Sequence, residues 1–377
     1  MTYELRQYDT PLLRFEVLRN TDDPELRILW VNSAEKHLLP LELEPNEDSL
    51  SSWIRHRVIP RNRAYVNRLL AKCGLSVNRP MDIISVCKGL SLNDSYWVVE
   101  EGFAGKFDKY NLYDNHISRI LGLISFTGYG SNPPSSLASS PEFTTGGMLP
   151  KCWRRVDGKI KLFKGGTSGA SNTGNEPYSE YYAFQIADKM GIRAVRYGLS
   201  CWKGYLCSTC ELFTDKDHAF VPTGQLLKKG GLEDVYAYYQ SLGSDYAQAF
   251  RDMLVFDAVV CNTDRHYGNF GFLVDSSTNR ICAPAPLFDH GNSLFSLAGE
   301  EYMASEESLQ RYADTLLPRV YDDFIGTAKQ YMNAKNREQL RRLVNFRFHK
   351  HTLYNYPDEY LRRIERMVQK RVNLLLE

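Results

Sequence analysis

Short apolar runs that alternate with turn residues mark the first hundred residues. The segments 12–18 (LLRFEVL) and 26–31 (LRILWV) are rich in branched and aromatic side chains, which predicts strands. The segment 59–74 instead repeats apolar residues at helical spacing, and Pro60 and Gly74 fit the first turn and the end of a helix. We therefore expect strands and helices to be mixed in this part of the chain.

Arginines crowd around this expected helix. A solvated helix face is the common explanation of such a cluster, and a surface for a binding partner is the alternative. The five residues concerned are Arg55, Arg57, Arg61, Arg63 and Arg68.

The middle of the chain predicts a hairpin followed by a helix. Residues 152–166 (CWRRVDGKIKLFKGG) contain two strand-like runs joined by Asp-Gly at 157–158, a pair typical of a two-residue hairpin turn. Pro177 opens a helical pattern that Gly191 ends, and more strands are expected within 193–213.

Two stretches rich in Ser, Thr, Gly and Pro flank the hairpin, at 130–146 and 165–175. Loops of this length inside a domain are often functional. From about residue 231 the pattern is mainly helical, except for 270–288, where two further strands are expected. The chain as a whole is therefore predicted to be α+β.

Composition narrows the class of protein. The chain has 377 residues, of which 43% are hydrophobic and 12% aromatic, so it is expected to fold into about two domains.

With 46 basic and 45 acidic side chains the net charge is +1, and we do not expect direct binding of nucleic acid. Because no run of 18 apolar residues exists and the first ten residues carry charges, we expect no membrane span and no export signal. A cytoplasmic protein with eight reduced cysteines is the resulting expectation.

The segment 255–295 holds the densest set of chemically active side chains. An apolar helix over 245–260, capped by Ser244, is predicted to run into the polar loop 262–266 (NTDRH). Polar residues at the end of a buried helix must be paired or functional. A predicted hairpin then returns the chain to Asp289.

Three residues of this segment have the order found in protein kinases. Asp264 precedes Asn269 by five residues, and Asp289 follows the hairpin and stands two residues before Gly291. Such a set supplies one carboxylate to orient a hydroxyl, and an amide oxygen and a second carboxylate to hold Mg²⁺ against phosphates. The pattern predicts phosphate transfer with ATP and Mg²⁺.

The parts that a kinase needs upstream are also present. The strand KIKLFK offers Lys161 and Lys164 for the phosphates, and the next helix offers Glu180 as an acidic partner. The sequence TTGG (144–147) stands where a loop over the phosphates would lie, and Glu211 to Phe213 follows a strand, as a connector between lobes should.

Three motifs resemble the HipA family of bacterial serine/threonine kinases. SEYYAFQIADKMGI (179–192) resembles the family's helix with an acidic residue before paired tyrosines, and NTDRHYGNFGF (262–272) resembles its TDxHxxN catalytic loop. LFDHG (287–291) resembles the segment with its metal-binding Asp. The likeness covers roughly 140–330, whereas the first hundred residues resemble the family only loosely.

This resemblance implies a protein-kinase-like bilobal fold. Residues 1–115 would form an additional N-terminal subdomain with a regulatory or partner-binding role. Residues 116–213 would form a mixed α/β N-lobe that binds the nucleotide, and residues 214–377 a mainly helical C-lobe with the catalytic loop and metal site.

The resemblance also implies roles for single residues. Lys164 matches the nucleotide lysine better than Lys161, and Glu180 matches its partner on the helix. Asp264 matches the catalytic Asp, and Asn269 and Asp289 match the magnesium ligands. The residues that would contact ATP, besides Lys164, are Glu211, Phe213, Thr145, Gly146, Gly147 and His266, although His266 also fits a role in orienting the loop.

Members of the family autophosphorylate a Ser in the loop before the first hairpin, which ejects the loop and switches the kinase off. The corresponding candidates in this chain are Thr144, Thr145, Ser139 and Ser140. The resemblance further implies a toxin that phosphorylates a translation component such as an aminoacyl-tRNA synthetase. A small helix-turn-helix antitoxin would be its partner.

Two other functions fit part of the pattern. DRHxxN followed by Asp-x-Gly also resembles lipid kinases of the phosphatidylinositol type, although the chain is small and its basic surface is weak. An ATP-binding pseudokinase that acts through its N-terminal region is the second alternative.

Overall fold

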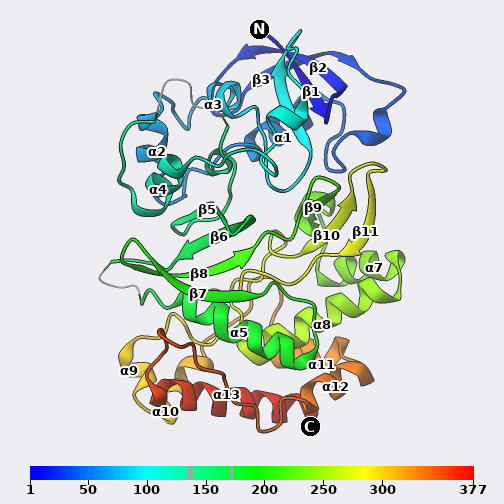
Figure 1. The fold of residues 1–377 in the computed structure, drawn as a ribbon. Helices are drawn as coiled ribbons and strands as arrows, with labels where there is room; N and C mark the ends of the chain where they lie inside the picture. Colours follow the sequence, from blue (N-terminus) through cyan, green and yellow to red (C-terminus); the bar gives the residue numbers. More distant parts are fainter. Residues whose placement is uncertain (134–138, 170–172) are drawn as a thin grey trace. The chain divides into compact units, whose positions relative to one another are not determined.

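The computed structural model describes residues 1–133, 139–169 and 173–377 (Figure 1). The chain forms two compact units. The first holds residues 1–164, 212–221 and 273–282, and the second holds 165–211, 222–272 and 283–377. Strands and short helices make up the first unit and helices dominate the second, so the predicted α+β class is confirmed.

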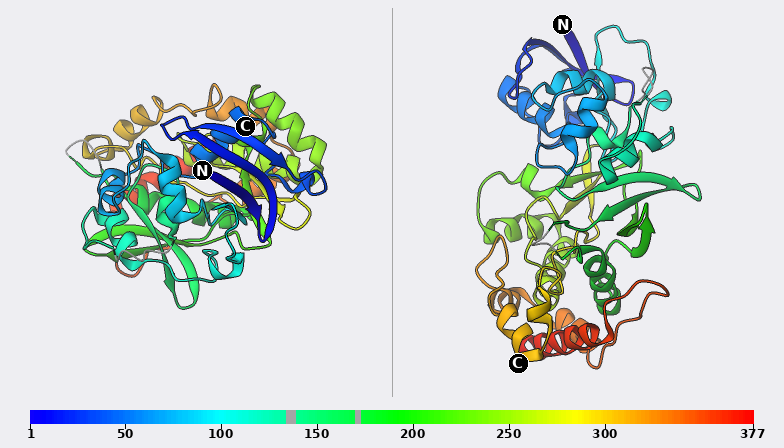
Figure 2. Two further views of the ribbon diagram at one scale, coloured as in Figure 1. Left: turned by 90° about the horizontal axis from the view of Figure 1, so that it is seen from above. Right: turned by 90° about the vertical axis from the view of Figure 1, so that its left-hand side faces the viewer.

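An antiparallel sheet opens the first unit, with its strands in the order β3-β2-β1-β4. The dark blue strands next to the N-terminus in Figure 2 belong to this sheet. The strands expected at 12–18 and 26–31 are confirmed as β2 and β3. Leu5 and Leu13 are paired across β1 and β2, and both are fully buried in the core beneath the sheet. The strands are β1 (Thr2–Gln7), β2 (Thr10–Arg19), β3 (Glu25–Val31) and β4 (Tyr96–Glu100).

Four helices complete the core of this unit. Helix α1 packs against β3, and α2 and α4 pack against each other around Phe143, which is fully buried. Their bounds are α1 (Glu47–His56), α2 (Val66–Lys72), α3 (Pro80–Cys87) and α4 (Arg119–Thr127), and short 3₁₀ turns lie at Lys36–Leu38, Phe107–Lys109 and Pro141–Phe143.

The helix predicted over 59–74 is only half correct. Helix α2 begins at Val66 because Tyr65 adopts a left-handed backbone, with a φ of 61°. Before it, the chain is held by other segments, since the Ile59 N–H donates to the Phe143 carbonyl at 2.7 Å. Tertiary hydrogen bonds have thus replaced the first helical turns.

Two of the five arginines around this helix are buried, so the prediction of one solvated or partner-binding arginine face is wrong for them. Arg57 is 6% exposed and binds both oxygens of Asp94, at 2.6 and 2.7 Å. Arg63 is 2% exposed and donates to the Leu149 carbonyl at 2.6 Å, and burial lowers its pKa to about 10. Both guanidiniums hold the unit together from inside.

The hairpin predicted around residues 157–158 is confirmed. It consists of β5 (Lys151–Val156) and β6 (Lys159–Gly165), and both turn residues have positive φ, at 51° and 76°. A further sheet, in the order β11-β10-β9, contains β9 (His218–Pro222), β10 (Gly271–Asp275) and β11 (Arg280–Pro284). The strand expected over 281–288 therefore ends at Pro284.

The polar stretches at 130–146 and 165–175 are only partly seen. Residues 134–138 and 170–172 lie outside the described residues. The remainder is irregular apart from the 3₁₀ turn at Pro141–Phe143 and the end of β6.

The second unit is built around a buried helix. Helix α8 (Ser244–Val260) packs against α7, α11 and α13, and every residue from Asp252 to Val260 is buried. Gly243, not Ser244, is its N-cap. The other elements are α5 (Glu176–Met190), the strands β7 (Tyr197–Trp202) and β8 (Tyr205–Glu211), α6 (Thr223–Leu226), α7 (Leu232–Leu242), α9 (Glu300–Met303), α10 (Glu306–Ala313), α11 (Phe324–Tyr331), α12 (Ala334–Arg341) and α13 (Asp358–Leu376).

Two expectations from composition can be compared with the structure. All eight cysteines are free thiols. Among the helices in the described part of the chain, none combines the length and the apolar character needed to cross a membrane.

Candidate active site

A buried ion pair lies under the predicted catalytic loop. Helix α8 ends at Val260, and its C-cap, Cys261, has a φ of 53° that turns the chain into the loop. Arg265 donates from Nε to Asp257 Oδ2 at 2.8 Å and from a terminal nitrogen to Oδ1 at 3.0 Å, and both side chains are fully buried. Burial lowers the pKa of Arg265, but the carboxylate of Asp257 more than offsets this and leaves that pKa raised. The guanidinium therefore stays charged.

The same guanidinium also joins two segments of the site. One terminal nitrogen of Arg265 donates to the Asn269 carbonyl at 2.9 Å and to the Phe288 carbonyl at 2.8 Å. Phe288 directly precedes Asp289, so a single side chain positions both the loop of Asp264 and the segment of the second carboxylate. Sequence reasoning missed Asp257 and Arg265. The available signal was a charged residue within the apolar stretch of a helix.

Amide side chains shape the loop further. Asn262 is fully buried, donates to Asp257 Oδ1 at 3.1 Å and accepts from the Asp264 N–H at 3.1 Å. Asn269 donates from Nδ2 to the Asp264 carbonyl at 3.2 Å. Its nitrogen is thereby engaged, and its Oδ1 is the atom that could bind a cation.

His266 orients the turn of the loop. Its Nδ1 accepts a hydrogen bond from the Gly268 N–H at 3.0 Å, which requires that this nitrogen carry no proton. Burial lowers the pKa of His266, so the neutral ring is favoured. The geometry fits the orienting role, and contact with ATP stays a prediction.

Helix α5 holds the segment that contains Asp289. Glu180 is fully buried, and its Oε2 accepts from the His290 N–H at 2.8 Å. Ser179 donates to the carbonyls of His290 and Ser293 at 2.6 and 2.8 Å. The α5 residue predicted to partner a lysine thus also fixes the backbone next to the second carboxylate.

The backbone at Asp289 is unusual. Asp289 has a φ of 60°, and its N–H donates to the Tyr197 hydroxyl at 3.1 Å. The neighbouring His290 is fully buried, packs against the Phe256 ring at 5.0 Å and lies 3.3 Å from a nitrogen of Arg265. The left-handed turn at Asp289 is therefore fixed by the hydrogen bond to Tyr197 and by the packing of His290.

Lysines gather at the hairpin of the first unit. Lys164 on β6 is 6% exposed and is paired with Lys151 on β5, which is 7% exposed. Lys161 lies three residues before Lys164, so the two side chains point to opposite faces of the strand. At Gly147, with a φ of 80°, an added Cβ would collide with Lys151 Nζ, which places that ammonium against the TTGG loop. Lys151 was not predicted.

The four candidate phosphate acceptors all donate hydrogen bonds. Ser139 and Ser140 are buried and bind the Cys87 carbonyl and the Glu142 carboxylate. Thr144 and Thr145 are only partly buried and bind the carbonyls of Leu90 and Pro141, at 2.9 and 2.6 Å. In this conformation the loop is folded against its own unit.

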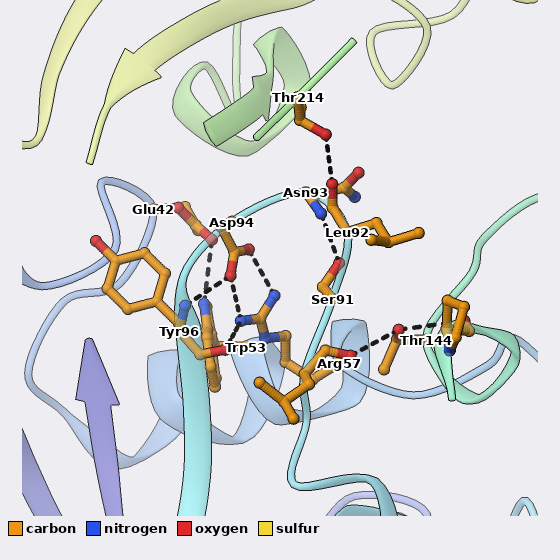
Figure 3. A network of polar contacts seen from close by, with 12 residues as sticks. Glu42, Trp53, Arg57, Ser91, Leu92, Asn93, Asp94, Tyr96, Thr144 and Thr214 are labelled. Atoms are coloured by element: carbon orange, nitrogen blue, oxygen red, sulfur yellow. Dashed lines mark hydrogen bonds and ion pairs between the residues drawn. The ribbon is translucent and has the colours of Figure 1, made fainter. Parts of the chain in front are cut away.

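Residues 90–96 tie this loop to the connector (Figure 3). Thr144 reaches the Leu90 carbonyl, and Thr214, which directly follows Phe213, donates to the Leu92 carbonyl at 2.5 Å. The ion pair of Asp94 with Arg57 fixes the same segment to the end of α1. The TTGG loop and the residue after the connector are therefore both hydrogen-bonded to the segment 90–96.

A magnesium site would have to be completed by phosphates. Within the described ranges, no three His, Cys, Asp or Glu side chains gather as a metal site. Mg²⁺ commonly takes one or two protein ligands together with phosphate oxygens and water. The amide oxygen of Asn269 and the carboxylate of Asp289 fit that requirement.

Comparisons with known proteins bear on the fold and on the family resemblance. No protein-family model matches the chain. The serine/threonine-protein kinase CtkA of Helicobacter pylori is 30% identical over 142 residues, which are 33% of this chain and 43% of that protein, so the match spans less than half the length of this relative.

One solved structure shares the fold over nearly the whole chain. HipA of the Shewanella oneidensis toxin–antitoxin system, solved with HipB and its operator DNA, superposes with a TM-score of 0.56 at 14% identity over 99% of both chains. The crystal structure of CtkA gives a TM-score of 0.48 at 20% identity, covering 60% of this chain and 92% of that one. The chain therefore has a HipA-like, protein-kinase-like fold, and its resemblance to the HipA-like serine/threonine kinases is confirmed.

Proposed function

We propose that the protein is a serine/threonine kinase that uses ATP and Mg²⁺. The observation that carries this proposal is the bridge made by Arg265, which binds the carbonyls of Asn269 and Phe288 with one nitrogen. A buried, charged side chain that joins these two segments makes sense if both must face the same ligand.

The residues of the second unit have two roles, which are to orient the acceptor hydroxyl and to bind magnesium. Asp264 orients the hydroxyl of the acceptor and takes its proton, because its carboxylate is partly exposed on a loop whose backbone is hydrogen-bonded by Asn262 and Asn269. Asn269 and Asp289 would hold magnesium through oxygen atoms. When bound, magnesium and ATP supply the phosphoryl group and neutralise its charge.

The residues of the first unit bind the phosphates. Lys164 and Lys151 are buried lysines on paired strands, and Lys151 lies against Gly147. Ammonium groups next to a glycine turn are suited to phosphate oxygens. The pairing of Lys164 with Glu180 stays a prediction.

Nucleotide titration tests the ligand assignment. We expect wild-type protein to bind ATP with magnesium, and Asp289→Ala and Asn269→Ala to weaken the magnesium-dependent part of that binding. Asp264→Ala is the matched control, since it should bind ATP normally while losing transfer. ATP binding that is independent of magnesium in the wild type would contradict the proposal, and binding without turnover would favour a pseudokinase.

Autophosphorylation is part of the proposal. Thr144 and Thr145 are better placed than Ser139 and Ser140, because only the two threonines are partly exposed. Phosphate on Thr144 would remove its hydrogen bond to the Leu90 carbonyl and so release the loop from residues 90–96.

We further propose a role as the toxin of a toxin–antitoxin pair, with a small helix-turn-helix antitoxin as partner and a translation component as substrate. Its support is the fold shared with HipA, which was solved with HipB and DNA. Induced expression should arrest growth, and Asp264→Ala should relieve the arrest. Harmless expression of active wild-type kinase would contradict the toxin role and leave the kinase proposal intact.

A further inference from the structure

The carboxylate of Asp264 has a cationic partner that lies far away in the sequence. Arg319, 55 residues further along, donates from one terminal nitrogen to Asp264 Oδ1. Arg319 stands between α10 and α11, outside all the kinase motifs. Arg265, although adjacent to Asp264, cannot serve in its place because it is committed to Asp257.

The contact leaves the second carboxylate oxygen of Asp264 available. Among the described residues, Arg319 makes this one hydrogen bond, and Asp264 Oδ2 accepts none. The side chains are 55% and 30% exposed, respectively. One carboxylate oxygen is thus held, and the other is available to accept a proton.

The segment around Arg319 contains a partly buried aromatic side chain. The ring of Tyr321 packs edge-on against Phe324 at 6.2 Å, and its hydroxyl is buried. Burial raises the pKa of the Tyr321 hydroxyl. Arg319 is therefore an exposed side chain two residues before a tyrosine whose hydroxyl is buried.

We propose that Arg319 is a positioning residue for phosphate transfer, which holds Asp264 Oδ1 so that Oδ2 faces the acceptor hydroxyl. The inference rests on the kinase function proposed above. In the step, the acceptor oxygen bonds to the γ-phosphorus, and the bond from phosphorus to the bridging oxygen breaks. The electron pair leaves with ADP, and the hydroxyl proton passes to Asp264 Oδ2.

The test compares autophosphorylation rates at saturating magnesium and ATP, together with the ATP concentration that gives half the maximal rate. For Arg319→Ala we expect the maximal rate to fall by about tenfold to a hundredfold, within the range of a positioned proton acceptor. The half-saturating ATP concentration should stay unchanged. Arg319→Lys should recover most of the rate, because a single N–H contact is within reach of an ammonium.

Arg366→Ala is the matched control. Arg366 is 57% exposed and ion-paired with Glu306, so it resembles Arg319 in exposure but lies on α13. Its variant should match the wild type, and thermal melting should show all variants folded.

The outcomes separate the two proposals. If Arg319→Ala transfers phosphate at the wild-type rate, the positioning role is overturned while the kinase function stands. The same holds if the variant is faster than wild type, because Arg319 would then inhibit Asp264. Loss of ATP affinity in place of rate would also overturn it. A wild type that transfers no phosphate would remove the kinase function and this inference together.

Discussion

Arg265 gives the candidate active site its geometry because its guanidinium faces three parts of the chain at once. It binds Asp257 on α8, the Asn269 carbonyl in the loop and the Phe288 carbonyl before Asp289. A charge buried to this degree is costly unless every donor finds an acceptor. Its interactions therefore fix the positions of the partners as well as contributing to stability.

Removing one member of this pair should be strongly destabilising. For Asp257→Ala we expect a loss of about 3–5 kcal/mol in the free energy of unfolding, because an unpaired charge would remain buried. Chemical denaturation measures this. The double variant Asp257→Leu with Arg265→Met should recover much of the stability but no kinase activity, since both carbonyls lose their donor. An active double variant would contradict the account of Arg265.

His266 should make the activity sensitive to acid. Burial lowers its pKa from the ordinary 6.5, and the bond from the Gly268 N–H requires the neutral ring. Because the folded-state pKa of His266 is lower than the unfolded-state pKa, the stability that the neutral ring gives the folded protein is complete above pH 6.5. That contribution is lost as the pH falls through the folded-state pKa.

Two variants test the His266 prediction. His266→Asn keeps an acceptor for the N–H two residues on but does not titrate, so its acid-side loss should be smaller than that of wild type. His266→Ala should be slower at every pH. Rate profiles over roughly pH 5 to 8 measure both effects, and identical acid limbs for wild type and His266→Asn would contradict the prediction.

At the scale of elements, the TTGG loop and the hairpin pack so closely that there is no space for a side chain at Gly147. Gly147 has a left-handed φ of 80°, and an added Cβ would meet Lys151, whereas Gly146 has open space around its Cα. Gly147→Ala should therefore strain the loop by about 1–2 kcal/mol and displace Lys151.

The adjacent glycine offers a control. We expect Gly147→Ala to weaken ATP binding several-fold and Gly146→Ala to leave it nearly unchanged, as measured by titration calorimetry. Equal effects of the two substitutions would mean that Lys151 and the turn at Gly147 have no special role.

At the scale of the whole molecule, local signals predicted local structure well. The Asp-Gly turn of β5 and β6 and the glycine that ends α5 were recognised because each places a required backbone conformation next to its element. The α+β class followed from the same patterns. The spacing of Asp264 and Asn269 predicted a single loop, and both residues lie on one loop joined by a hydrogen bond, while their roles stay predictions.

Features that depend on tertiary contacts could not be predicted. The buried arginines Arg57 and Arg63 looked like surface charges because their partners are 37 and 86 residues away in the sequence. The left-handed backbone of Tyr65 and the hydrogen bond from Ile59 to Phe143 shorten the expected helix, and no local pattern records either. The pair of Asp264 with Arg319 likewise joins segments that have no shared motif.

Mass spectrometry of the intact protein and its peptides after incubation with magnesium and ATP tests the central claim most directly, with wild type beside Asp264→Ala. The account predicts added phosphate on wild type only, at Thr144 or Thr145 before Ser139 or Ser140. Phosphate added equally to Asp264→Ala, or ATP-bound wild type that stays unmodified and transfers nothing to any added serine/threonine protein, would contradict it.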